Sequence, residues 1–275
     1  MACLAAMGLI AESAGPEVSG EIRVDGSDVL LLNGDERRSL AGRVMAMIFQ
    51  DPMTALNPYI NVGSQVAEVF RIHEGKNRRE AFGLAVSWLD RVGLDEAAAV
   101  ARKYPHELSG GMRQRVVIAM ALACGPKVLF ADEPTTALDS NHTIAILRLI
   151  RGLTRDLGTA VLLVTHDLTL AKHVADRVVV FYAGEMVEEG TAQSVLDNPI
   201  HPYTRSLMQS SIDLDEPDRA MQLMIGHPPD FANLPAGCTF QPRCPVAVDE
   251  CKSSVQQLEP VTHTARQVRC SEVRS

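Results

Sequence analysis

Short apolar runs alternate with longer periodic segments over the first 190 residues of the chain. An apolar run of four to six residues bounded by turn residues is typical of a buried strand. Three runs have this form: Val44–Phe49, Val128–Ala131 and Ala160–Thr165. Gly20–Val24 followed by Asp25-Gly26 predicts a further strand and a tight turn, and the residues around Ala183-Gly184 predict a hairpin.

Helical periodicity fills the segments between these strands. It extends from Val62 to about Lys103, over Met112–Cys124, and from Ile146 to Leu157, where Gly158 is a suitable C-cap. Strands that alternate with helices predict an α/β architecture with a mainly parallel sheet. We expect a helical part over residues 51–124 within this domain.

Beyond about Gly190 the pattern changes, because Pro, Asp and Cys become frequent and the periodicity fades. We therefore expect a main domain over residues 1–190 and a smaller C-terminal extension over residues 191–275.

Composition narrows the class of function. The 275 residues are 46% hydrophobic and carry a formal net charge of -8, so the chain lacks the basic balance of a nucleic-acid-binding protein. No apolar run is long enough to span a bilayer. The apolar N-terminus has no Lys or Arg before it, so it makes a poor secretion signal. We expect a cytosolic chain that reaches a membrane only through a partner.

Two adjacent carboxylates, Asp132 and Glu133, follow the apolar run at residues 128–131. The carboxyl ends of parallel strands border the crevice where ligands bind in open α/β sheets. Asp132 is placed to hold Mg²⁺, and Glu133 is placed to orient and deprotonate a water molecule. The alternative is a strand that ends in a solvated acidic turn.

Four further features lie at element ends, and each alone has an ordinary structural explanation. Ser109 with Gly110 and Gly111 opens a helix, so the turn suits an anion or is a simple N-cap. His166 and Gln50 each follow a predicted strand. Asp139 could cap the helix that it precedes.

Taken together and in order, these features resemble the ATP-binding subunit of ABC transporters over Gly20 to about Gly190. Gln50 corresponds to the Q-loop glutamine, and Leu108–Met112 to the signature motif. Asp132 and Glu133 correspond to the Walker B aspartate and catalytic glutamate, Asp139 to the D-loop and His166 to the switch histidine.

The resemblance implies a P-loop NTPase fold of the ABC type, with a parallel-sheet core and a helical subdomain. It implies ATP and Mg²⁺ as ligands, with Asp132 and Gln50 at the metal. Glu133 and His166 would be catalytic, while Ser109–Gly111 and Asp139 would contact nucleotide. The implied partners are a second ATPase subunit, identical or not, transmembrane permease subunits at the cytoplasmic face of the membrane and, indirectly, an extracytoplasmic binding protein.

A narrower resemblance is to the oligopeptide, dipeptide and nickel importers. It is carried by Phe49–Pro58, Tyr104–Glu107, Asn198–Thr204 and the cysteine-bearing tail. Within this branch, we expect a peptide rather than nickel as the transported substrate. The ATPase residues themselves do not select the substrate, because selectivity in such importers lies in the binding protein and permeases.

The chain departs from the family in one respect, since no G-x-x-x-x-G-K-[ST] string occurs in it. Cys3–Ile10 resembles the helix that follows this phosphate-binding loop, so we expect a fold that is incomplete at the N-terminus. Loss of the loop removes several charge-assisted hydrogen bonds to phosphate and makes ATP hydrolysis by this chain doubtful. Either the chain is a truncated form of a complete subunit, which we favour, or it contributes only its signature motif to a loop-bearing partner.

Six cysteines are present, and four of them lie in the last 38 residues. Cys238, Cys244, Cys251 and Cys270 are separated by five, six and eighteen residues, unlike the close pairs of common zinc sites. The family resemblance implies a [4Fe–4S] cluster there, with a structural role; the alternative is four unligated thiols. A chain acting chiefly as a metal-binding or redox module is a third, weaker hypothesis.

Overall fold

The structure is a computed structural model that describes residues 1–10, 17–135, 140–210, 224–262 and 264–273. The chain divides into two compact units, Met1–Thr165 and His166–Ser275. This division differs from the sequence-based boundary near Gly190, which stays a prediction about domain organisation.

A parallel sheet organises the first unit, with strand order β3-β4-β5. Its strands are Met45–Ile48, Val128–Asp132 and Ala160–Val164. The register pairs Ile48 with Ala131 and Asp132 with Val164, so the three strands end at one edge. This confirms the predicted α/β class with a parallel sheet.

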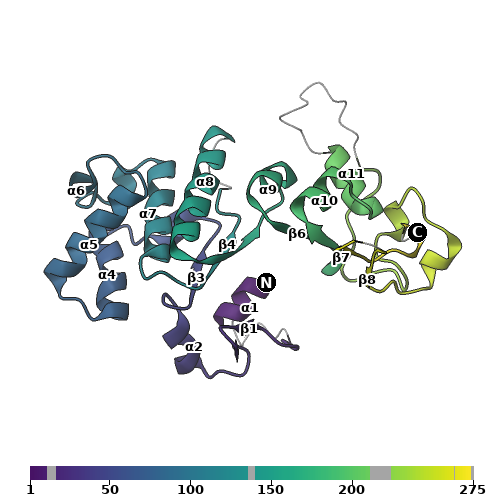
Figure 1. Ribbon diagram of the computed structural model, residues 1–275, viewed down its shortest axis with the longest axis horizontal. Helices are drawn as coiled ribbons and strands as arrows, with labels where there is room; N and C mark the ends of the chain where they lie inside the picture. The colour runs from purple at the N-terminus through teal and green to yellow at the C-terminus, as the bar shows by residue number, and fades with distance from the viewer. Residues whose placement is uncertain (11–16, 136–139, 211–223, 263, 274–275) are drawn as a thin grey trace. The chain divides into compact units, whose positions relative to one another are not determined.

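Side chains of alternate strand residues enter two different hydrophobic clusters. Ala46, Ile48 and Leu129 pack with the helices, whereas Met45 and Phe130 pack with the N-terminal segment. Successive residues of a strand point to opposite faces, so β3 and β4 are covered on both faces. Figure 1 shows the helices and the N-terminal segment on opposite sides of β3 and β4.

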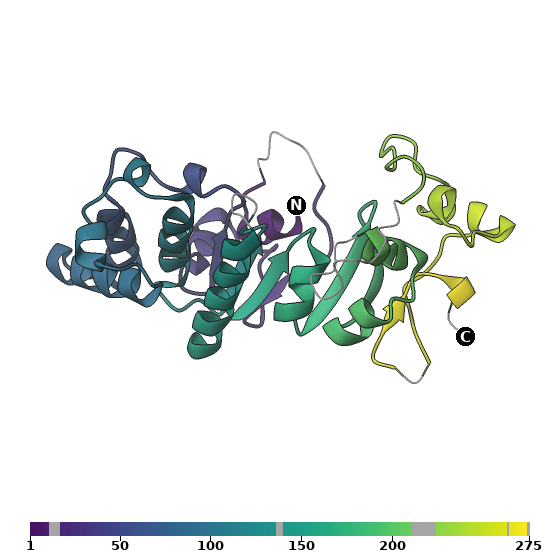
Figure 2. The same ribbon diagram turned by 90° about the horizontal axis from the view of Figure 1, so that it is seen from above.

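Helices α3 to α8 form the larger cluster. Their bounds are α3 Pro52–Ala55, α4 Val62–Glu74, α5 Arg78–Arg91, α6 Ala97–Val100, α7 Gly110–Leu122 and α8 Ser140–Leu157, with a 3-10 turn at Pro105–Glu107. Helix α8 lies along the sheet in Figure 2, and Gly158 ends it with φ of 69°, as the sequence predicted.

The N-terminal segment contains α1 Ala2–Met7, β1 Arg23–Val24, β2 Ser27–Asp28 and α2 Gly34–Leu40. The predicted turn is present, since Asp25 and Gly26 have φ of 52° and 81°. The strand predicted over Gly20–Val24 is shorter than expected, because β1 pairs only with the two residues of β2.

The second unit holds an antiparallel sheet of order β6-β7-β9-β8. The hairpin β6 Arg177–Tyr182 and β7 Glu185–Thr191 confirms the prediction around Ala183-Gly184. The other elements are α9 Leu168–Val174, α10 Ala192–Asp197, α11 Pro202–Ser210, β8 Glu259–Pro260, β9 Gln267–Val268, and 3-10 turns at Gln241–Arg243, Asp249–Lys252 and Ser271–Val273.

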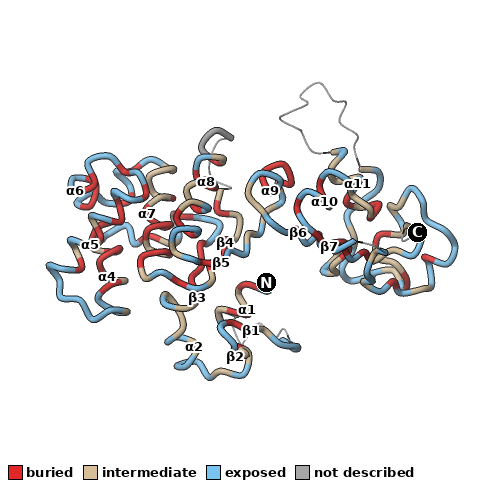
Figure 3. Tube along the Cα trace, viewed as in Figure 1, coloured by how far each residue is buried: buried red, intermediate tan, exposed pale blue. Residues whose placement is uncertain are grey.

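One predicted strand differs from its expected environment. Ala160–Thr165 was expected to be buried, but four of the five residues of β5 are exposed (Figure 3). Val161, Leu162 and Val164 are 41%, 48% and 41% exposed. The reason is position, because β5 is the edge strand of its sheet and an edge lacks the cover that a central strand receives.

Candidate functional site

Gln50 and Glu133 meet at the carboxyl edge of the parallel sheet, 83 residues apart in the chain. The amide Nε2 of Gln50 donates a hydrogen bond to Oε2 of Glu133 at 3.1 Å. Gln50 follows β3 by one intervening residue, and Glu133 directly follows β4. These two strand ends therefore bring their polar side chains together, while the roles expected of Gln50 and Glu133 stay predictions.

The backbone at Glu133 leaves the strand sharply. Its N–H still donates to the carbonyl of Val164 at 2.9 Å, but its φ is 44°, in the left-handed region. A non-glycine residue in this region is strained and is frequent at functional sites. Asp132, the last residue of β4, stands directly beside it and is partly exposed.

Asp132 is also close to the first helix. Burial raises the pKa of the Cys3 thiol, and the negative charge of Asp132 raises this pKa further. Cys3 is buried in α1, as expected for a small hydrophobic residue. The N-terminal helix therefore lies near the carboxylate edge of the sheet.

The turn before α7 uses its serine as an N-cap. Oγ of Ser109 accepts a hydrogen bond from the Met112 N–H at 3.3 Å, and the helix begins at Gly110 instead of the predicted Met112. Arg113 stabilises the turn, because its Nη1 donates a hydrogen bond to the carbonyl of Leu108 at 2.9 Å. Ser109 is exposed, and Gly110 and Gly111 are half-buried, so the turn remains accessible to a ligand.

Two predicted site residues are not placed with this group. Asp139 lies outside the described residues. His166 follows β5 by one residue and begins the second unit, so it is described only within that unit. The next residue, Asp167, caps α9 through a 3.1 Å hydrogen bond from the Leu170 N–H.

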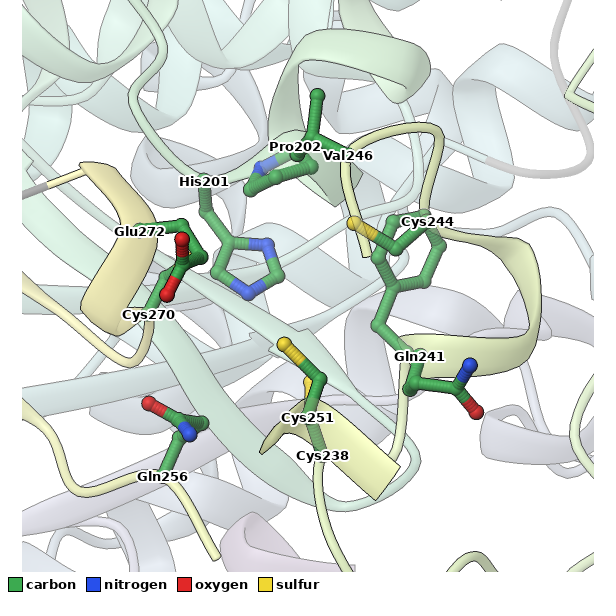
Figure 4. Close-up of a pocket in the computed structure, with 11 residues that line it drawn as sticks. His201, Pro202, Cys238, Gln241, Cys244, Val246, Cys251, Gln256, Cys270 and Glu272 are labelled. Atoms are coloured by element: carbon green, nitrogen blue, oxygen red, sulfur yellow. The ribbon is translucent and has the colours of Figure 1, made fainter. Parts of the chain in front are cut away.

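The four C-terminal cysteines line one pocket of the second unit, together with His201 and Gln256 (Figure 4). Burial raises the pKa of the Cys238, Cys244 and Cys270 thiols, and neighbouring thiols raise it further. All six cysteines of the chain are free thiols. Within the described part of the chain, no three His, Cys, Asp or Glu side chains are grouped closely enough to hold a metal ion.

Sequence reasoning missed a buried polar network beside this pocket. Glu188 accepts hydrogen bonds from the N–H groups of Ile200 and His201, both at 3.0 Å, and pairs with Arg266. Glu188, His201 and Arg266 are all buried. The sequence offered one signal, the segment Asn198–Thr204. It resembles a family branch, but the resemblance did not predict its contacts with Glu188.

A parallel sheet with adjacent carboxylates at its carboxyl edge, joined there by a glutamine from the neighbouring strand, is the architecture of a nucleotide-hydrolysing α/β domain. The chain belongs to the ABC transporter family: the family description "ABC transporter" matches residues 7–136, and "Oligopeptide/dipeptide transporter, C-terminal region" matches residues 187–251.

Individual relatives agree with this assignment. The chain is 45% identical to the oligopeptide transport ATP-binding protein OppD of Escherichia coli, over 94% of this chain and 76% of the relative. It is 42% identical to AppD of Bacillus subtilis, an oligopeptide transport ATP-binding protein, over 97% of this chain and 81% of that one. The ATP-binding cassette MJ0796, solved as a dimer with ADP and Pi, is 30% identical and has a TM-score of 0.57 over 63% of this chain and 74% of that chain.

Helices of the described residues are all too short or too polar to cross a lipid bilayer.

Proposed function

We propose that this chain is the ATP-binding subunit that energises an ABC importer for peptides. Two lines of support agree: relatives that cover most of the chain are named as oligopeptide transport ATP-binding proteins, and the second unit matches an oligopeptide transporter region. Nickel, the other cargo of the branch, has no support among these named relatives.

The hydrogen bond between Gln50 and Glu133 is the single observation that carries the proposed mechanism. In it, Glu133 orients the water that attacks the γ-phosphate and takes its proton, and the Gln50 amide fixes the carboxylate that does so. Asp132 and Gln50 would hold Mg²⁺, and His166 would contact the γ-phosphate, as the family resemblance implies. The fit to Mg²⁺ is chemical, since carboxylate and amide oxygens are its preferred protein ligands.

Ser109, Gly110 and Gly111 would contact nucleotide held by a second ATPase subunit, with Asp139 near the same interface. The exposure of Ser109 and the half-burial of the two glycines suit this role. We propose that permease subunits bind the Gln50–Lys103 region, which would place the chain at the cytoplasmic face of the membrane. A binding protein outside the membrane would deliver the peptide.

A second candidate is a partner subunit that does not hydrolyse ATP itself. The observation in its favour is the accessible turn at Ser109, which a chain can present to a partner's nucleotide without hydrolysing ATP itself. Such a subunit would supply only the turn at Ser109 to nucleotide bound by a loop-bearing partner.

Glu133→Gln distinguishes these functions. If this chain itself hydrolyses ATP, the substitution should lower its ATP turnover at least about a hundredfold, which is the usual contribution of a general base. Glu96→Gln is the matched control, because Glu96 also has a left-handed backbone, with φ of 52°, and is exposed away from the sheet edge. Turnover that survives Glu133→Gln contradicts the assigned base.

Ser109→Arg tests the second function in a mixture with a loop-bearing partner subunit. Turnover by the mixture should fall while turnover by the partner alone is unchanged. Asn77→Arg is the control, because it also removes an exposed N-cap, at α5. ATP titration of the purified chain, alone and with that partner, separates binding from turnover.

We also propose a [4Fe–4S] cluster on Cys238, Cys244, Cys251 and Cys270. The donor chemistry fits, because four thiols line one pocket and thiolates are the ligands of such clusters. The described thiols are not grouped closely enough to hold a metal ion, so binding would have to draw them together. Thiols with raised pKa are protonated before binding, so the site releases protons when it binds metal. Bound there, the cluster would cross-link the C-terminal extension.

A further inference from the structure

Three of the four pocket thiols belong to one tightly bonded loop. The N–H of Cys238 donates to the carbonyl of Cys251 at 2.9 Å. The N–H of Gln241 donates to the carbonyl of Cys238 at 3.0 Å, and the N–H of Cys244 donates to the carbonyl of Gln241 at 3.2 Å. This loop therefore holds Cys238, Cys244 and Cys251 through its own backbone.

Cys270 reaches the pocket from a separate segment. It lies two residues beyond β9, which pairs with β7, and it lies outside the family match that ends at residue 251. The preceding residue, Arg269, donates its N–H to the carbonyl of Val187 in β7 at 2.9 Å. The position of the fourth thiol thus depends on contacts that the three-cysteine loop does not provide.

Gln256 holds this segment on both sides of Cys270. Its side-chain Oε1 accepts the N–H of Ser271 at 3.0 Å, and its main-chain carbonyl accepts Nη1 of Arg269 at 2.9 Å. Gln256 is buried and lines the thiol pocket. A buried amide with these partners fixes the backbone on which Cys270 stands.

His201 also lines the pocket, and its ring points into the pocket in Figure 4. Nδ1 accepts the N–H of Tyr203 at 3.1 Å, so we assign the proton of the neutral ring to Nε2. The ring also hydrogen-bonds the main chain of Arg269, directly before Cys270. The carboxylate of Glu188 accepts a hydrogen bond from the main-chain N–H of His201 and so fixes its backbone.

We propose that Gln256 and His201 are positioning residues that hold Cys270 at the pocket lined by the other three thiols, so that metal binding can draw all four onto one metal centre. This inference rests on the proposed cluster and adds residues that are not themselves ligands. Side chains that orient the ligands of a metal site commonly govern its affinity and composition.

The matched pair Gln256→Leu and Gln256→Glu tests the role of the Oε1 acceptor. The purified full chain is reconstituted anaerobically with equal amounts of ferrous and ferric iron and with sulfide. It is examined by iron analysis and, after reduction with dithionite, by electron paramagnetic resonance. The parent chain and Gln256→Glu, which keeps an acceptor for Ser271, should form a [4Fe–4S] cluster. After addition of one equivalent of ferricyanide, which accepts one electron, Gln256→Leu should lose one ferrous ion and give a [3Fe–4S]+ signal, as expected when one of four ligands is displaced.

Two controls guard against a general loss of structure. Gln257→Leu changes the adjacent, exposed glutamine and should behave as the parent chain does. In the metal-free chain, Gln256→Leu should speed alkylation of Cys270 severalfold and leave Cys238 unchanged. If Gln256→Leu does not fold, His201→Leu takes its place and should give the same two results.

The outcomes separate the two proposals. A [4Fe–4S] signal in Gln256→Leu equal to that of the parent overturns the positioning role and leaves the cluster standing. No iron on the parent chain overturns the cluster, while selective alkylation of Cys270 then still supports the positioning of its thiol. Equal acceleration at all four cysteines would show a merely structural role and would sink the inference.

Discussion

His201 illustrates at the residue scale how burial sets a pH dependence. Burial lowers the pKa of His201 from 6.5 to about 4, against a hydrogen bond that raises it. The unfolded chain therefore binds a proton at this residue, between these two values, that the folded chain does not. Its contribution to stability is complete above about pH 6.5 and is lost as the pH falls towards 4.

We predict that the free energy of unfolding of the metal-free chain falls between pH 7 and pH 4.5, with His201 accounting for roughly 3 kcal/mol at most. Urea unfolding at both pH values measures this difference. His201→Leu should show a smaller loss than the parent chain, whereas His227→Leu, which changes an exposed histidine, should not. An equal loss in the parent and in His201→Leu would exclude the residue as the source.

Residue-scale prediction from sequence was uneven for a physical reason. The meeting of Gln50 and Glu133 could be predicted, because both follow strands that end at one sheet edge. The contact between Glu188 and Arg266 could not be predicted, because the two residues are 78 positions apart and no strand pattern indicates that they meet. Buried polar residues acquire partners only through tertiary packing, which a single sequence does not display.

At the scale of elements, two glycines in neighbouring helices occupy opposite environments. A Cβ at Gly63 of α4 would lie 2.6 Å from the carbonyl oxygen of Ala101, whose backbone also accepts the Gly63 N–H. A Cβ at Gly83 of α5 would meet nothing within 4 Å. The first glycine permits close packing, and the second only weakens its helix.

We predict that Gly63→Ala destabilises the chain by about 2 kcal/mol, because helix α4 must move away from Ala101. Gly83→Ala should stabilise it by up to about 1 kcal/mol, the propensity difference between the two residues in a helix. Chemical unfolding of both variants checks the pair. Stabilisation by both substitutions would disprove the close packing at Gly63.

Element types were easier to predict than their limits. The predicted strand at residues 128–131 and hairpin around Ala183-Gly184 are present. The start of α7 was missed because Ser109 caps it two residues earlier than the apolar period suggested. The prediction that β5 is buried was wrong. An apolar run indicates that burial of the strand would be favourable, but it does not show whether other elements pack against the strand.

On the scale of the whole molecule, the apolar edge strand β5 has consequences for association. Exposed Val and Leu on an edge strand invite pairing with another chain. We predict that the purified chain self-associates through this edge and that Leu162→Lys weakens this association roughly tenfold, which corresponds to about 1.4 kcal/mol. Sedimentation velocity at matched concentrations measures the change.

Leu31→Lys is the control for that measurement, because Leu31 is 84% exposed and lies outside the strand. If Leu31→Lys and Leu162→Lys act alike, added charge explains the result and the edge does not. The α/β class followed from the sequence because strands alternate with helices, whereas the division after Thr165 depends on which segments contact one another.

The left-handed backbone of Glu133 implies that a substitution which stabilises the fold at this position would remove its carboxylate. Glycine adopts this conformation without penalty, so a library screened only for heat resistance should enrich the substitution Glu133→Gly and discard the carboxylate. If Glu133 is the general base proposed above, variants selected for heat resistance alone would lose ATP hydrolysis, so such a selection would have to test hydrolysis in the same round.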